Sequence, residues 1–213
     1  MRLPIVMFDF GNVLGFFDYG LIYARFGARL GLSASAFQTL VESKGMSSLL
    51  AEFEAGAMSP EAFAARVQGE VGLDISFEDF VADWQDIFEL NEPVARLVAD
   101  LKAKGYTLVL GSNTNAIHAA FYRRRFRETL DHFDHFVLSH EVKAMKPSRA
   151  FFDACTAVVG VPAGSCVFID DIEENVEGAR AAGLRGIVYK EPAGLVRDLQ
   201  ALGVEASAYG RSN

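Results

Sequence analysis

Near the start of the chain stands the stretch Ile5-Val6-Met7-Phe8-Asp9-Phe10-Gly11-Asn12-Val13-Leu14. Its first four residues are all apolar, Asp9 follows them directly, and a glycine comes two residues later. A run this short and this apolar is typical of a strand that is buried on both faces of a parallel sheet. Asp9 would then lie at the carboxyl end of the strand, which is the edge where open α/β sheets bind ligands. The stretch therefore predicts an α/β fold with a parallel sheet and a functional site at the carboxyl end of its first strand.

Four later apolar runs predict the other strands of this sheet. They are residues 107–110, 135–138, 166–169 and 187–189. Helical patterns separate these runs, which indicates an α/β fold with a doubly wound parallel sheet and right-handed crossovers. Polar residues follow three of the strands: Asp9 after the first, Ser112-Asn113 after the second and Asp170-Asp171 after the fourth. We expect all of them at one edge of the sheet.

A helical module interrupts the α/β pattern directly behind Asp9. Residues 15–91 contain helical patterns and no convincing buried strand, and Ser59-Pro60 and Ser76 are helix starts with a capping hydroxyl. We therefore expect two domains. Residues 1–14 and 92–205 would form the α/β core domain, and residues 15–91 would form an inserted helical domain.

Composition excludes several classes of partner. The 213 residues carry 28 acidic and 20 basic side chains, a formal charge of −8, which argues against binding to nucleic acid. No run of 18 or more apolar residues is present, and the first strand begins too early to leave room for a signal peptide. Cys155 and Cys166 lie in apolar patterns without CxxC spacing, as reduced core thiols do. We expect a cytoplasmic protein without a membrane partner; the oligomeric state is not predicted.

The polar residues at the expected edge suggest a metal and a phosphate group. Asp9, Asp170, Asp171 and Lys146 together carry a charge of about −2, and close carboxylates do not all stay ionised without a cation. Oxygen ligands favour a hard divalent ion, and Mg²⁺ suits a site that water and a substrate phosphate complete. The Ser112 hydroxyl and the N–H groups of the following helix would cradle the phosphate. Asp9, if unpaired, would be ionised at neutral pH and ready to attack phosphorus.

Four stretches, in order, resemble the four motifs of the haloacid dehalogenase (HAD) superfamily. They are Phe8-Asp9-Phe10-Gly11-Asn12-Val13, Leu110-Gly111-Ser112-Asn113-Thr114-Asn115, Lys146-Pro147 and Val167-Phe168-Ile169-Asp170-Asp171, with Asn175 four residues further on. The resemblance covers residues 4–190. It implies a HAD-like Rossmannoid core, and the inserted helices are similar to the family's cap of the first type. The residues Ser112-Asn113-Thr114-Asn115 of the second stretch and the glycine at position 11 resemble the corresponding motifs of bacterial α-glucose-1-phosphate phosphatases.

The resemblance also implies roles in catalysis and phosphate binding. Asp9 would be the nucleophile and would form an aspartyl-phosphate. Ser112 and the Asn113 amide would bind the phosphate of a small phosphorylated metabolite. Lys146 would hold the charge of the nucleophile and the phosphate.

For the metal, the resemblance implies a set of oxygen ligands around Mg²⁺. Asp9 and Asp171 would bind the ion directly, together with the backbone carbonyl of Gly11. Asp170 would reach it through water, and Asn175 would support that loop from behind.

Gly11 is a departure from the pattern of most phosphatases in this family. They have a second aspartate there, which acts as general acid and base. Such catalysis is typically worth roughly 10² to 10⁴ in rate, so its absence slows the enzyme or restricts it to good leaving groups, unless a residue of the cap substitutes.

The sequence therefore leaves four functions open. The first is a Mg²⁺-dependent phosphatase acting on a small phosphorylated metabolite such as a sugar phosphate. The second is a phosphate- or metabolite-binding regulatory protein with little turnover. The third, a metal-independent 2-haloacid dehalogenase, is disfavoured because the acidic pair would repel its substrate. The fourth, a response-regulator receiver, would carry the acidic pair on its first strand and would have no helical insertion.

Overall fold

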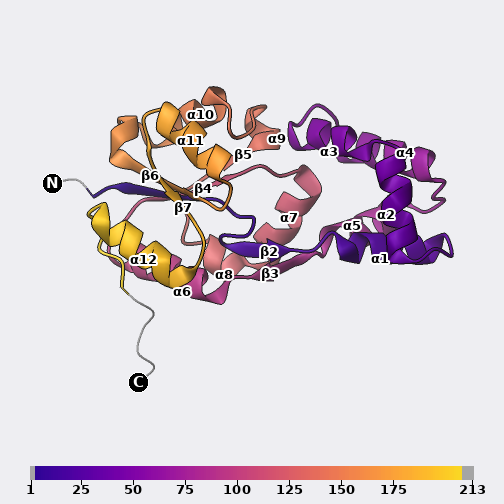
Figure 1. Ribbon diagram of the computed structural model, residues 1–213, viewed down its shortest axis with the longest axis horizontal. Helices are drawn as coiled ribbons and strands as arrows, with labels where there is room; N and C mark the ends of the chain where they lie inside the picture. Colours follow the sequence, from indigo (N-terminus) through magenta and orange to yellow (C-terminus); the bar gives the residue numbers. More distant parts are fainter. Residues whose placement is uncertain (1–2, 208–213) are drawn as a thin grey trace, which may run out of the picture.

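The computed structural model describes residues 3–207 and has a five-stranded parallel sheet at its centre (Figure 1). The strands are β1 (Ile5–Phe8), β4 (Leu108–Ser112), β5 (His135–Leu138), β6 (Cys166–Asp170) and β7 (Arg185–Val188). They lie in the order β5-β4-β1-β6-β7, and every neighbouring pair is parallel. This confirms the doubly wound sheet predicted from the sequence and places β1 in the middle of it.

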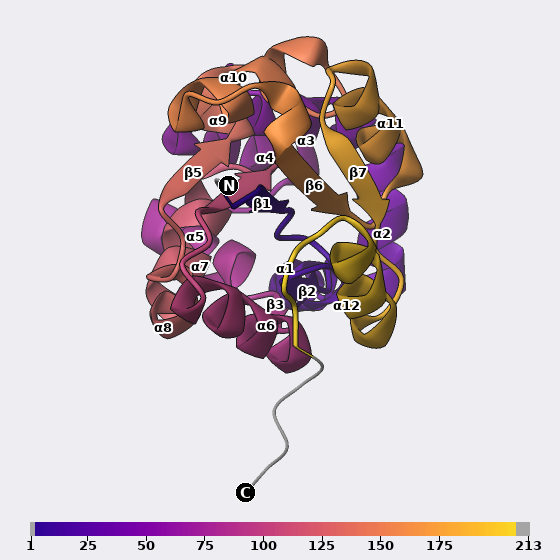
Figure 2. The same ribbon diagram turned by 90° about the vertical axis from the view of Figure 1, so that its left-hand side faces the viewer.

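Helices cover both faces of the sheet, as Figure 2 shows. On one face lie α6 (Glu92–Ala103), α7 (Ala116–Arg125), α8 (Arg127–Leu130) and α12 (Pro192–Ala201); on the other lie α9 (Ser139–Val142), α10 (Arg149–Val159) and α11 (Glu173–Ala181), and a short 3-10 turn, η1 (Ala163–Ser165), precedes β6. Val6 and Phe8 of β1 pack into the first layer, whereas Ile5 and Met7 pack into the second. The first apolar run is therefore apolar throughout because successive side chains are buried on opposite faces. Within residues 3–207, no helix has the length and apolar character needed to cross a bilayer.

Five helices between β1 and α6 form a second bundle, which we call the helical insertion. They are α1 (Gly20–Arg29), α2 (Ala34–Ser43), α3 (Met46–Glu54), α4 (Pro60–Val71) and α5 (Phe77–Gln85). They enclose a hydrophobic cluster of their own and lie beyond the carboxyl edge of the sheet (Figure 1). Ser59 and Ser76 accept hydrogen bonds from the backbone N–H groups of Ala62 and Asp79, so both predicted capping residues begin a helix.

A small antiparallel ribbon that the sequence did not predict joins the insertion to the sheet. No convincing buried strand was expected in residues 15–91, and the two short strands that pair here, β2 (Gly15–Phe17) and β3 (Phe88–Leu90), are mostly exposed or half-buried. Each strand has only three residues, which is too short for the apolar alternation that identifies strands. The ribbon brings the two ends of the insertion together beside Asp9.

Both cysteines lie in the core as unpaired thiols, as their sequence context predicted. Cys155 and Cys166 are fully buried, and neither forms a disulfide. Both pack in the layer between the sheet and α10 and α11.

One close approach between backbones positions the loop that carries Lys146. A Cβ atom added at Gly178, in α11, would lie 2.5 Å from the carbonyl oxygen of Pro147 and 2.8 Å from its Cβ. Only glycine leaves room for α11 to pack against this proline. The residue before Pro147 is Lys146, so this contact supports the expected site directly.

We predict that Gly178→Ala lowers the free energy of unfolding. Overpacking of this kind costs about 1–3 kcal/mol, whereas alanine gains only ~1 kcal/mol over glycine in a helix. Gly69→Ala is the matched control, because no described atom lies within 4 Å of a Cβ at this exposed position of α4. The control should raise stability in urea unfolding; a stabilised Gly178→Ala variant would show that the close approach is not a constraint.

Candidate active site

The carboxyl edge of the sheet gathers the acidic residues that the sequence singled out. Asp9 follows β1, and Ser112 and Asp170 end the two strands that flank it, β4 and β6. The backbone N–H of Asp9 donates to the carbonyl of Ile169 at 2.9 Å, which fixes it beside Asp170. Oxygen atoms of Asp9, Asp170 and Asp171 lie within 4.8 Å of one another. The predicted convergence of residues far apart in the sequence is therefore present.

Lys146 is buried between two of these carboxylates. Its Nζ atom donates to Asp9 Oδ1 at 2.6 Å and to Asp170 Oδ2 at 2.7 Å, and the residue is only 5% exposed. Burial by itself lowers the pKa of Lys146, but the attraction of Asp9 and Asp170 outweighs it and raises the pKa above its usual value. The ammonium group therefore stays charged and holds both carboxylates in place.

Asp9 is not the unpaired, freely ionised carboxylate that the sequence suggested. Burial raises its pKa to about 7, the attraction of Lys146 lowers it, and the charges of Asp170 and Asp171 raise it. Its exposed fraction is 6%. A bound cation would add a second positive charge beside Lys146 and favour the ionised form.

The two adjacent aspartates differ in how their oxygen atoms are used. Both Asp170 oxygens accept protein hydrogen bonds: Oδ1 from Ile172 N–H and Asn175 Nδ2, and Oδ2 from Lys146. Asp171 is half-buried and accepts from Asn12 Nδ2 at 3.1 Å. Asn12 has a φ of 54°, a left-handed conformation that asparagine tolerates. Asp171 thus has more freedom than Asp170 to bind a metal ion, and Asn175 lies behind Asp170 as expected.

Asn113 anchors the loop of Lys146. Its side-chain oxygen accepts from the Lys146 N–H at 2.8 Å, and its Nδ2 donates to the Lys146 carbonyl at 3.1 Å. Ser112, which is 2% exposed, donates its hydroxyl to the Asn113 carbonyl at 3.3 Å. From the sequence, the Asn113 amide was expected to bind phosphate, and this anchoring of Lys146 by the Asn113 side chain was not predicted.

The helical insertion contacts the phosphate-cradle loop through Ser139. The Ser139 hydroxyl donates to the carbonyl of Glu54, the last residue of α3, at 2.6 Å and also lies 3.0 Å from the Thr114 carbonyl. The N–H of Thr114 donates back to the same hydroxyl at 2.9 Å. Lys143 adds a hydrogen bond to the carbonyl of Gly56. These bonds join the end of α3 to Thr114, which comes two residues after Ser112 in the loop.

A small cavity of about 70 Å³ lies at this junction. Its polar lining comes from the cradle residues 112–114 of the core, from Glu54 and Tyr19 of the insertion, and from His118 and Tyr122 of α7. Burial raises the pKa of Glu54 to about 7. Glu54 was not predicted from the sequence, because a glutamate at the end of an amphipathic helix is indistinguishable from a solvated surface residue.

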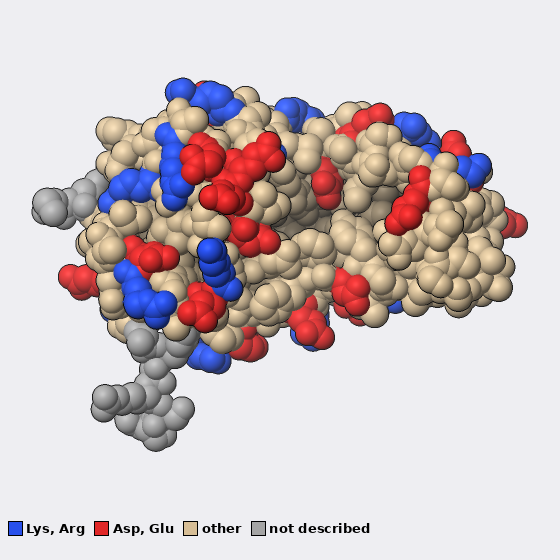
Figure 3. Space-filling model, viewed as in Figure 1, with Lys and Arg blue, Asp and Glu red and all other residues tan. Residues whose placement is uncertain are grey.

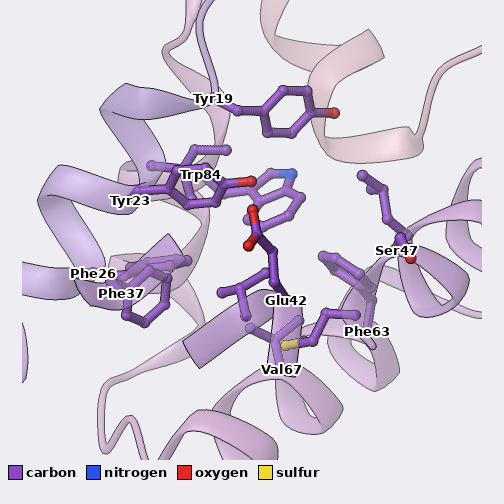
Figure 4. Close-up of a pocket in the computed structure, with 13 residues that line it drawn as sticks. Tyr19, Tyr23, Phe26, Phe37, Glu42, Ser47, Phe63, Val67 and Trp84 are labelled. Carbon is purple, nitrogen blue, oxygen red and sulfur yellow. The ribbon is translucent and has the colours of Figure 1, made fainter. Parts of the chain in front are cut away.

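A larger, mostly apolar cavity of about 320 Å³ lies inside the helical insertion (Figure 4). Aromatic side chains line it, among them Tyr23, Phe26, Phe63 and Trp84, and Figure 4 shows the Glu42 carboxylate directed into it. Tyr19 lines both cavities, so the apolar space and the small cavity at the carboxyl edge of the sheet adjoin at this residue. In Figure 3 the surface is hollowed between the sheet domain and the insertion.

Comparison with known proteins identifies the family. The family model of haloacid dehalogenase-like hydrolases matches residues 6–183, and the chain belongs to this family. It is 29% identical over 226 residues to Phosphatase MT3486 of Mycobacterium tuberculosis, covering 95% of this chain and 96% of the relative.

Solved structures agree with this assignment. A HAD family enzyme of Bacteroides thetaiotaomicron, bt-2542, crystallised in complex with magnesium and inorganic phosphate, has a TM-score of 0.76 and 25% identity over 89% of this chain and 95% of its own. A HAD-like family hydrolase of Porphyromonas gingivalis shares the fold with a TM-score of 0.77 at 22% identity, over 95% of this chain and 98% of its own. The family, the fold and the hydrolase class are thus established.

The raised pKa of Glu54 predicts a pH-dependent difference in stability. The carboxyl has a pKa of about 7 in the folded state, against 4.5 for an unperturbed glutamate, so the folded state binds the proton more tightly. Its contribution to stability is complete below pH 4.5 and is lost as the pH rises through 7. Glutamine does not ionise, so the Glu54→Gln variant does not lose this stability as the pH rises. The variant should therefore gain stability relative to the wild type as the pH rises from 4.5 through 7 in urea unfolding, and a constant difference would contradict the raised pKa.

Proposed function

We propose that the protein is a Mg²⁺-dependent phosphatase that hydrolyses a small phosphorylated metabolite through an aspartyl-phosphate on Asp9. The observation that carries the proposal is the group formed by the buried Asp9, Asp170 and Lys146 and the half-buried Asp171 at one edge of the sheet, beside the Ser112 hydroxyl. Three acids around one lysine leave a net negative charge, which favours a divalent cation and a phosphate bound to it over a phosphate alone.

In this mechanism Asp9 is the nucleophile. A carboxylate oxygen of Asp9 attacks phosphorus, and Lys146, held 2.6 Å from Asp9, neutralises charge on the phosphoryl oxygens. Ser112 and the Asn113 amide orient the phosphate. The Asn113 side chain keeps the Lys146 backbone in position, so that one loop serves the phosphate and the lysine together.

The donor set suits magnesium. Asp9, Asp171 and the Gly11 carbonyl would hold the ion directly, and Asp170 would reach it through water because protein donors already occupy both of its oxygens. All of these donors are hard oxygen atoms. When bound, Mg²⁺ would stabilise negative charge on the phosphoryl group.

The helical insertion would act as the cap that encloses the organic part of the substrate. Its bundle stands over the carboxyl edge of the sheet, and the cavity at Tyr19 adjoins an apolar space of about 320 Å³. A sugar phosphate is one candidate substrate. The aromatic lining of the larger cavity favours esters with an apolar group as well, so a substrate panel should contain both kinds.

One observation supports a second candidate function. Gly11 stands where a general acid would be expected, which fits a phosphate- or metabolite-binding regulatory protein with little turnover. Tight binding of metabolites without phosphate release over the whole panel would favour it. A 2-haloacid dehalogenase remains disfavoured, because the three clustered carboxylates would repel a carboxylate substrate.

Phosphate release from p-nitrophenyl phosphate should depend on Mg²⁺ and on Asp9. Asp9→Asn removes the nucleophile and should lower the rate by at least about 10³-fold. Asp153→Asn is the control, because Asp153 is exposed and forms an ion pair with the exposed Arg149. Equal rates for the wild type and Asp9→Asn would rule out the proposed mechanism.

Magnesium affinity should depend on Asp171. Asp171→Asn removes one ligand charge and should weaken Mg²⁺ binding by about 10-fold or more in titration calorimetry. Glu173→Gln, two residues further along and exposed, tests for a general loss of negative charge and should leave the affinity unchanged. Unaltered binding by Asp171→Asn would remove Asp171 from the ligand set.

A further inference from the structure

Gly11, two residues after Asp9, has no side chain that could serve the leaving group. A Cβ atom added at Gly11 would lie 3.0 Å from Cε1 of the Phe17 ring. Phe17 belongs to β2, the ribbon strand that leads into the helical insertion. A larger residue at position 11 would require this exposed ring to shift. Because glycine supplies no acid, a proton donor has to come from another element.

The small cavity beside the phosphate cradle contains four titratable side chains: Tyr19, Glu54, His118 and Tyr122. Both nitrogens of the His118 ring have protein partners, Asn115 and the Trp84 carbonyl, and burial lowers its pKa to about 4. Burial raises the pKa values of Tyr19 and Tyr122 well above their usual range. Neither tyrosine releases a proton readily at neutral pH, and the histidine is neutral there.

Glu54 differs from the other three. Its backbone carbonyl is tied to Ser139, which also bonds Thr114 of the cradle, so the residue has a defined place at the wall of the cavity. No protein donor or cation within residues 3–207 bonds the carboxylate of this half-buried residue, which leaves its oxygen atoms available to a ligand in the cavity. Burial keeps its pKa at about 7, which is the range in which one group can both give and take a proton at neutral pH.

We propose that Glu54 is the general acid and base of the reaction and that it replaces, from the helical insertion, the carboxylate missing at Gly11. The inference rests on the proposed phosphatase function. It makes α3 part of the catalytic machinery, because the last residue of this helix lines the cavity beside Ser112.

Glu54 gives up a proton in the first half-reaction and regains one from water in the second. An Asp9 oxygen forms a bond to phosphorus while the bond from phosphorus to the ester oxygen breaks, and the departing oxygen keeps the electron pair and takes the proton of Glu54. In the second step the Glu54 carboxylate takes a proton from water as the water oxygen bonds to phosphorus. The bond to Asp9 then breaks with its electron pair returning to the carboxylate. The products are the alcohol and inorganic phosphate, and Glu54 is protonated again.

The test compares esters whose leaving groups differ in their need for a proton. p-Nitrophenolate leaves without protonation, whereas an alkoxide, as from n-butyl phosphate, does not. Glu54→Gln should lower kcat/KM for n-butyl phosphate by about 10²-fold or more and leave kcat/KM for p-nitrophenyl phosphate within about threefold. Its turnover of p-nitrophenyl phosphate should slow after a burst of about one equivalent of p-nitrophenol, because water then lacks its base.

A control variant and a pH profile of the wild type complete the experiment. Glu52→Gln, two residues earlier on the same helix and paired with the exposed Arg66, should leave both esters unaffected. In the wild type, kcat/KM for n-butyl phosphate should fall above about pH 7 relative to that for p-nitrophenyl phosphate, because Glu54 has lost its proton.

The outcomes separate the two proposals. An equal loss on both esters in Glu54→Gln, no loss on either, or parallel pH profiles of the two esters in the wild type would overturn the role of Glu54 and leave the phosphatase proposal intact. Absence of Mg²⁺-dependent hydrolysis of every ester by the wild type would overturn the phosphatase proposal itself.

Discussion

The buried contact of Lys146 with Asp9 and Asp170 is the interaction on which the rest of the site depends. Two carboxylates at the ends of neighbouring strands lie in a dry environment, and one ammonium group 2.6 and 2.7 Å away compensates their charge. Removing one partner of such a group typically costs about 3–5 kcal/mol, because the other charges remain buried without compensation. The fold therefore has to hold the Lys146 ammonium group within hydrogen-bond distance of both carboxylates. The side chain of Asn113 and the close packing of Gly178 against Pro147 both serve that purpose.

The second constraint is the meeting of the helical insertion with the sheet. The β2–β3 ribbon, Ser139 and Lys143 all connect the two parts near residues 112–114. On the proposed mechanism, the insertion is thereby held where the ester group would leave. Phe17 of the ribbon lies beside Gly11, and it lines the small cavity together with Glu54 at the end of α3. On this proposal, Glu54 of the insertion supplies the carboxylate that is absent at position 11.

The position of a site residue was predictable where the residue comes at the end of a strand. Asp9, Ser112 and Asp170 are examples, because each comes at the end of a buried apolar run and parallel strands bring their carboxyl ends to one edge. Prediction failed where the role depends on environment. The ionisation of Asp9 was considered only for an unpaired carboxylate, because its burial and its contact with Lys146 were not visible in the sequence. The β2–β3 ribbon was missed because three residues show no period, and the side-chain role of Asn113 was missed because its partner lies 33 positions away.

The sequence by itself determined the parallel sheet, the helical insertion and the acidic edge, because these follow from local apolar patterns and from the order of polar residues along the chain. Only the tertiary structure decided which groups face one another across that edge. Glu54 is the clearest case: its distance in the sequence from Ser112 is large, and its surroundings are set by Ser139, which belongs to a third segment. Charge states and contacts of this kind depend on burial and on packing between segments, and no local pattern encodes either.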